Sequence, residues 1–239
     1  MDIRLKLDIQ RQPDDTTCGP TCLKAIYRYY GDLLPLQQLI EEVPRLNGGG
    51  TLGVLMGSHA LRRGYKATLY TYDLRMFDPT WFSNPEADLR RSLIRQARAK
   101  QDVKLHEATH ACLEFLDLGG EIRFNDLTPD LLSRYLRNGI PIMTGLSSTY
   151  LHGSARERGW DDEEDPIRGT SAGHFVVLSG YDAKNQQVLV ADPIRRHRKS
   201  RQRLYTVSVH RLIGAILLGV LSYDGNLLIL EKPKQRKTD

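Results

Sequence analysis

The chain has 239 residues, of which 40% are hydrophobic and 26% are charged, and its formal net charge is +5. This ordinary globular composition excludes a wholly disordered chain. The most apolar stretch, Leu212–Leu221, reaches only about half of the roughly 20 residues that a membrane-spanning helix needs. We therefore expect a soluble protein without a membrane partner, in which this stretch is a buried helix or strand.

The three cysteines are an odd number, and their spacing is typical of no disulfide framework. The segment Met1–Leu7 alternates charged and apolar residues and lacks the apolar core of a secretory signal. We therefore expect free thiols in a reducing compartment, and hence a cytoplasmic location. Cys18 and Cys22 do not indicate zinc either, because Cys112 has no cysteine neighbour to complete a second ligand pair.

Charge is concentrated in two runs, the acidic Asp161–Asp165 and the basic Arg195–Arg203, which flank the segment that carries His174. The simpler interpretation is that each run is a solvated loop. The alternative is that the two runs form opposite walls of a charged cleft.

The first half of the chain predicts mostly helices. The first helix is expected to begin at Thr16–Thr17, residues that cap helices well, and to end at Gly31, so that Cys18 lies in its first turn. Helical spacing of apolar residues continues at 36–43, 51–64, 87–100, 103–116 and 130–137, and one alternating strand is expected at 66–72.

Beyond Gly139 the pattern predicts strands separated by turn residues, at 140–146, 174–181, 187–191 and 226–231. Helices followed by strands favour an α+β protein with two lobes. We expect a single catalytic domain over residues 1–239, in which 1–138 form a mainly helical lobe and 139–239 a mainly antiparallel sheet lobe.

Two distant segments suggest one chemistry. Cys18 stands at a predicted helix start, and a helix N-terminus together with a nearby imidazolium lowers the pKa of a thiol and makes it a nucleophile. His174 begins one predicted strand and Asp192 ends the next, so an antiparallel pairing would bring them together, with the carboxylate orienting the imidazole. Gln12 precedes the helix and can offer an amide N–H to a developing oxyanion, with the backbone N–H of Cys18 as second donor.

These motifs resemble the double-glycine leader peptidases of bacteriocin-exporting transporters, and more closely their free-standing relatives, among the papain-like cysteine peptidases. In that family a Gln precedes the nucleophilic Cys by six positions at a Cys-Gly-Pro-like helix start, as Gln12 precedes Cys18. A later His-(Phe/Tyr)-Val-Val strand and an Asp-Pro pair match His174–Val177 and Asp192–Pro193. The resemblance implies a papain-like fold with Cys18 as nucleophile, His174 as general base, Asp192 as orienting residue and Gln12 as oxyanion donor.

The chain also departs from the family pattern. No transporter follows, and the stretches 73–126 and 147–172 are longer than a minimal leader peptidase needs. Double-glycine specificity is therefore not part of the expectation.

We predict a cysteine peptidase that hydrolyses a peptide or amide bond of a peptide-like substrate through a Cys18 thioester, without cofactor or metal. A transpeptidase or acyltransferase, which passes the same thioester to an amine, remains an alternative. A second alternative is a non-catalytic module that binds nucleic acid or another polyanion through Arg195–Arg203. No aromatic platform is interleaved with that run, so nucleic acid is not the partner we favour.

Other candidate residues have simpler interpretations. Cys22 is expected to pack in the core, Asp182 to serve a turn, and Gln10 to lie at the wrong spacing from Cys18 for an oxyanion donor. The string His106–His110 fits the His-Glu-x-x-His zinc signature. No third ligand is evident downstream, and the cysteine constellation explains more of the chain, so we do not favour zinc.

Overall fold

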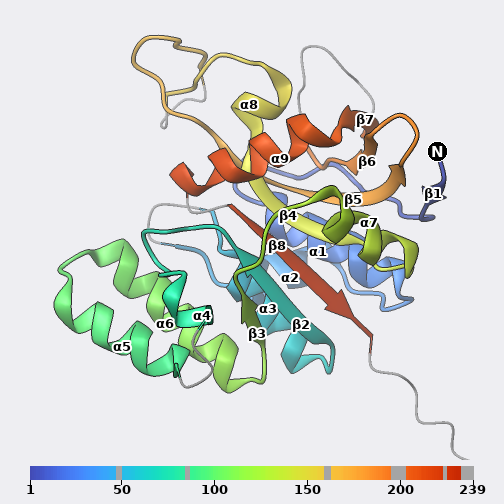
Figure 1. Ribbon diagram of the computed structural model, residues 1–239. Helices are drawn as coiled ribbons and strands as arrows, with labels where there is room; N and C mark the ends of the chain where they lie inside the picture. The colour runs from blue at the N-terminus through green and yellow to red at the C-terminus, as the bar shows by residue number, and fades with distance from the viewer. Residues whose placement is uncertain (47–49, 84–86, 159–162, 195–202, 223–224, 233–239) are drawn as a thin grey trace, which may run out of the picture.

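The computed structural model describes residues 1–46, 50–83, 87–158, 163–194, 203–222 and 225–232. Most of the glycine triplet Gly48–Gly50, part of the acidic run and nearly all of the basic run lie outside these described residues. Within them, one sheet runs through the molecule and helices lie on both sides of it (Figure 1).

Every helix and strand expected from the sequence is present, with bounds that differ by at most a few residues. The helices are α1 (Cys18–Tyr29), α2 (Leu36–Glu42), α3 (Gly53–Arg62), α4 (Thr80–Ser83), α5 (Leu89–Ala99), α6 (Val103–Asp117), α7 (Pro129–Arg137), α8 (Ser148–His152) and α9 (Val209–Leu218), the last followed by the 3-10 turn η1 (Gly219–Ser222). The strands are β1 (Ile3–Arg4), β2 (Lys66–Thr71), β3 (Glu121–Arg123), β4 (Ile142–Ser147), β5 (Gly173–Asp182), β6 (Gln187–Ala191), β7 (Leu204–Ser208) and β8 (Asn226–Glu231).

The sheet has the order β3-β2-β8-β4-β5-β6-β7, and β1 pairs with β5. All pairings are antiparallel except that of β2 with β3. Because β8, near the end of the described chain, lies between β2 and β4, strands from both halves of the sequence share this sheet. Gly180 in β5 lets β1 approach closely, since a Cβ there would lie 2.6 Å from the carbonyl oxygen of Ile3.

Both faces of the sheet are buried, as the pattern of β8 illustrates. Leu228 and Leu230 belong to an apolar cluster that also contains residues of α1, α3 and α6, while Leu227 and Ile229 belong to a second cluster with residues of α7 and α9. A strand covered on both faces is continuously apolar rather than alternating. Each such side chain contributes about 1.5–3 kcal/mol on burial, so the centre of the sheet is a firm support for residues at the strand ends.

The apolar stretch Leu212–Leu221 lies in α9 and η1, as one of the two forms expected for it. In the part of the chain that the structure describes, no helix has the length and apolar character required to cross a membrane.

Candidate active site

Cys18 is the first residue of α1, and it is only partly buried, whereas Cys22 and Cys112 are buried. Thr17 occupies the N-cap position but does not cap the helix with its side chain; its hydroxyl instead donates to the backbone oxygen of Asp14 at 3.1 Å. The thiol therefore stands at the positive end of the helix dipole, where a negative charge is favoured.

The start of α1 is pressed against α3 at Gly19. A Cβ at this position would lie 2.7 Å from Cγ2 of Thr51 and 2.8 Å from Sδ of Met56. The residue after Cys18 is thus required to be small by packing, and this contact fixes where the thiol lies relative to the rest of the fold.

The antiparallel pair β5 and β6 brings His174 and Asp192 together. Val177 is paired with Ala191, so Asp192 comes opposite Val176, which shares a face of the strand with His174. Nε2 of His174 lies 2.8 Å from Oδ1 of Asp192, and the two residues are 6% and 0% exposed. The proximity expected from the sequence is therefore present.

Burial alone would raise the pKa of Asp192, but the His174 charge, the nearby His152 and the hydrogen bonds from His174 and Tyr205 hold it far below its ordinary value. Burial likewise disfavours the charged form of His174. The Asp192 carboxylate and a hydrogen bond with Cys18 outweigh that effect and raise the His174 pKa well above 6.5. Since Nε2 is directed to Asp192, Nδ1 is the ring nitrogen left for the sulfur. The imidazole thus lies between the carboxylate and Cys18, in surroundings that favour its protonated form.

Gln12 is 5% exposed and is linked to both halves of this arrangement. Its backbone N–H donates to the carbonyl of Pro193 at 2.9 Å, directly beside Asp192. Its side-chain Nε2 donates to the carbonyl of Asp14 at 2.9 Å, the same oxygen that accepts from Thr17. These bonds anchor one amide hydrogen of Gln12 in the turn that leads to Cys18 and leave the second for another acceptor.

Two contacts of Asp192 were not expected from the sequence. The hydroxyl of Tyr205 donates to Oδ2 at 2.6 Å, and Nε2 of His152 lies 3.4 Å from the same oxygen. A signal for Tyr205 existed, because residues 204–208 alternate as a strand; in the structure this strand pairs Tyr205 with Val190, two residues before Asp192. His152 lies in a short helix far away in sequence, and no local pattern identifies it.

The simpler interpretations of the other polar residues are confirmed. Cys22 is buried and its thiol donates to the backbone oxygen of Phe175 at 3.2 Å; burial raises its pKa. Asp182 accepts from the backbone and side chain of Asn185, as a turn residue does, and these bonds lower its pKa to about 2. Gln10 accepts instead from Lys24 at the surface.

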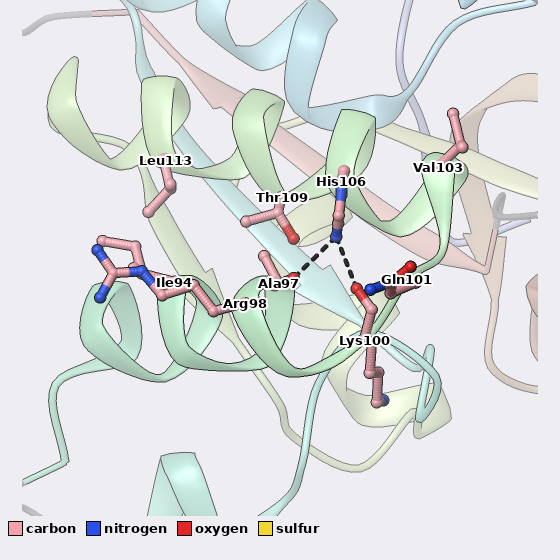
Figure 2. Close-up of a pocket in the computed structure, with 9 residues that line it drawn as sticks. All are labelled: Ile94, Ala97, Arg98, Lys100, Gln101, Val103, His106, Thr109 and Leu113. Carbon is pink, nitrogen blue, oxygen red and sulfur yellow. Dashed lines mark hydrogen bonds between the residues drawn. The ribbon is translucent and has the colours of Figure 1, made fainter.

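The zinc-like string on α6 forms no metal centre in the structure. Nε2 of His106 lies 2.8 Å from the carbonyl oxygen of Ala97 and 2.7 Å from that of Lys100, in the pocket between α5 and α6 (Figure 2). A nitrogen that faces two carbonyls carries the proton, so it is not free to bind a metal. Among the described residues, no three His, Cys, Asp or Glu side chains are grouped so that they could hold a metal ion.

Residues 122–211 match the model of the Peptidase_C39 like family; this stretch contains His174 and Asp192. A solved structure described as a C39-like peptidase from Bacillus anthracis is 14% identical, covers 98% of each chain and has a TM-score of 0.53. The peptidase domain of Streptococcus ComA, a bi-functional ABC transporter involved in a quorum-sensing pathway, is 16% identical over 95% of this chain and 99% of its own, with a TM-score of 0.46.

A double-glycine motif protease from an AMS/PCAT transporter, solved with its leader peptide, is 13% identical over 97% of this chain and 96% of its own, with a TM-score of 0.47. No curated protein matches the chain. The family match agrees, over residues 122–211, with the resemblance predicted from the sequence, and the Bacillus anthracis structure shares the α+β fold of this chain.

Proposed function

We propose that the protein is a cysteine peptidase in which Cys18 is the nucleophile, His174 the general acid and base, Asp192 the orienting carboxylate and Gln12 an oxyanion donor. The observation that supports this most strongly is the position of His174, which bonds to Asp192 through Nε2 and to Cys18 on its other side. A raised imidazole pKa beside a partly exposed thiol at a helix start favours the thiolate–imidazolium pair.

In the proposed reaction, the Cys18 thiolate attacks the carbonyl carbon of a peptide bond. The tetrahedral oxyanion accepts hydrogen bonds from the free amide N–H of Gln12 and from the backbone N–H of Cys18. His174 gives its proton to the leaving amine, which leaves a thioester on Cys18. Water then loses a proton to His174 and attacks the thioester, releasing a carboxylic acid, which ionises in solution, and restoring the ion pair.

The buried carboxylate of Asp192 serves both steps. Its negative charge favours the imidazolium form before attack, and its bond to Nε2 keeps Nδ1 directed to the sulfur. Asp192 has no exposed surface, so water does not compete for these bonds. The arrangement needs no further group to activate the thiol.

Alkylation by iodoacetamide across pH tests this proposal without knowledge of the substrate. We expect wild-type Cys18 to react near pH 5.5 about tenfold faster than in His174→Ala, which lacks the imidazolium that stabilises the thiolate. Cys22 and Cys112 are buried and provide internal controls, read by peptide mapping. Equal rates of Cys18 modification in the two proteins would refute the catalytic pair.

The substrate class in this proposal is a peptide or peptide-like amide, handled by one catalytic domain in the cytoplasm. Product analysis with added amines separates hydrolysis, which yields the free acid, from acyl transfer, which yields the amine adduct. The polyanion-binding alternative depends on Arg195–Arg203, nearly all of which lies outside the described residues, and no observed contact favours it.

A further inference from the structure

Asp192 has hydrogen-bonding groups at both of its oxygens. Oδ1 lies 2.8 Å from Nε2 of His174 and accepts from the backbone N–H of Ile194 at 2.9 Å. Oδ2 accepts from Tyr205 and faces Nε2 of His152 at 3.4 Å. The carboxylate therefore lies between two histidines, and only one of them has a place in the proposed reaction.

The second histidine is held firmly. His152 is the last residue of α8, and its side chain is only 8% exposed. Arg211 of α9 donates to the carbonyls of Leu151 at 2.8 Å and Tyr150 at 2.7 Å, which secures the end of α8. The oxygen of Ser147 caps the start of the helix by accepting from the backbone of Tyr150. These bonds hold the backbone of α8, and burial restricts the space open to the imidazole of His152.

We propose that His152 is a positioning residue that acts through Asp192, an inference that rests on the proposed function. Its Nε2–H and the hydroxyl of Tyr205 hold Oδ2, so that the carboxylate cannot rotate and Oδ1 stays directed to His174. A nitrogen facing a carboxylate oxygen carries the hydrogen, which sets the tautomer of His152. Without this donor, Tyr205 alone would hold the second oxygen of a buried charge.

The groups that surround the carboxylate agree with this role. His174 on β5, His152 on α8 and Tyr205 on β7 face it, and Cys18 on α1 lies beyond His174. Burial and the nearby Asp192 charge raise the pKa of Tyr205, so that it remains a protonated donor. The segment 147–172 is longer than a minimal leader peptidase needs. It contributes α8 and, with it, His152 beside the Asp192 carboxylate.

The test is the pH profile of Cys18 alkylation in variants of the full chain. We expect His152→Phe to react about tenfold more slowly than wild type near pH 5.5, the lower end of the effect of one hydrogen bond to a charged group. His152→Gln, whose amide nitrogen reproduces the place of Nε2, should stay within about threefold of wild type. His210→Gln, the same change at an exposed histidine, should leave the profile unaltered.

A merely structural role would predict something different. If His152 only filled space, Phe would preserve the profile, and that result would overturn the proposal. If His152→Phe does not fold, the proposal is tested by comparing His152→Asn with His152→Gln, because the shorter amide of Asn cannot reach Oδ2. A loss of reactivity in Asn but not in Gln supports the proposal, and equal profiles overturn it. Failure of the proposed function would be visible separately, as a wild-type Cys18 that reacts like an ordinary thiol.

Discussion

Replacing Asp192 with Asn keeps the shape of the side chain and removes its charge. One oxygen of the carboxylate is hydrogen-bonded to His174 and to the backbone N–H of Ile194, and the other accepts from Tyr205. An amide has a single oxygen, so its NH₂ group must face one of these sets of donors. Asp192→Asn therefore replaces an ion pair by a neutral contact. It also places the amide NH₂ against hydrogen-bond donors in a site that solvent does not reach.

The cost follows from the burial of the site. Each charge-assisted bond that becomes neutral loses about 1 kcal/mol, and one buried donor left without an acceptor costs about 1–3 kcal/mol. Since Asp192 is 0% exposed, solvent screening does not reduce these values. We expect Asp192→Asn to lower the free energy of unfolding by about 2–4 kcal/mol near pH 7.

This difference should depend on pH in a defined way. The folded pKa of Asp192 is lowered, so its contribution is present above the unfolded value near 4 and is lost as pH falls through the folded pKa. The folded pKa of His174 is raised, so its contribution is complete below about 6.5 and is lost as pH rises through the folded pKa. Wild type and variant should thus differ most near pH 5–6.5.

Urea unfolding across pH measures the stability difference, and iodoacetamide alkylation of Cys18 measures the effect on the thiol. Asp182→Asn is the matched control for alkylation, because Asp182 serves a turn and should leave Cys18 unaffected. If Asp192→Asn unfolds at the wild-type urea concentration and retains the wild-type alkylation profile, the argument that this buried charge sustains the ion pair is wrong.

Two further substitutions test other parts of the site. Gln12→Ala should reduce the rate of peptide hydrolysis by about 10²–10³, the effect of losing one oxyanion donor. Alkylation of Cys18 forms no oxyanion, so its rate should stay near that of wild type. An equal loss of rate in both assays would contradict the oxyanion role. Gly19→Ala places a Cβ 2.7 Å from Thr51 and 2.8 Å from Met56, and should lower the free energy of unfolding by about 1–3 kcal/mol, measured by urea denaturation. An unchanged urea midpoint would show that α1 has room to shift.

The helices and central strands were predictable because their signals are local. Apolar spacing located α1, α6 and α7, and the continuous apolar run at 226–231 identified β8 although its neighbours β2 and β4 are distant in sequence. Three strands were missed: β1, β3 and β7. β1 and β3 have only two and three residues and depend on their partners, since β1 pairs with β5 beyond the end of β4 and β3 pairs with β2 at the edge of the sheet. β7 has an alternating pattern, which was not identified as a strand from the sequence.

The candidate site was predictable for a related reason. Gln12 and Cys18 belong to one turn, and His174 and Asp192 belong to two consecutive strands whose antiparallel pairing follows from a short connection. His152 has neither kind of link to Asp192. The contact depends on how α8 packs against α9 through Arg211, and no sequence pattern specifies that arrangement.

Cys18 and Cys22 illustrate how position on one helix separates two roles of the same residue type. Cys22 lies one turn further along α1, where burial and then the nearby Cys18 and Asp192 raise its pKa and keep it a neutral thiol bonded to Phe175. Cys18 is at the N-terminal end of the helix, partly exposed and bonded to His174, whose pKa is raised. The second thiol thus has neither exposure nor a cation, and this contrast is the physical basis for expecting a single reactive cysteine in the chain.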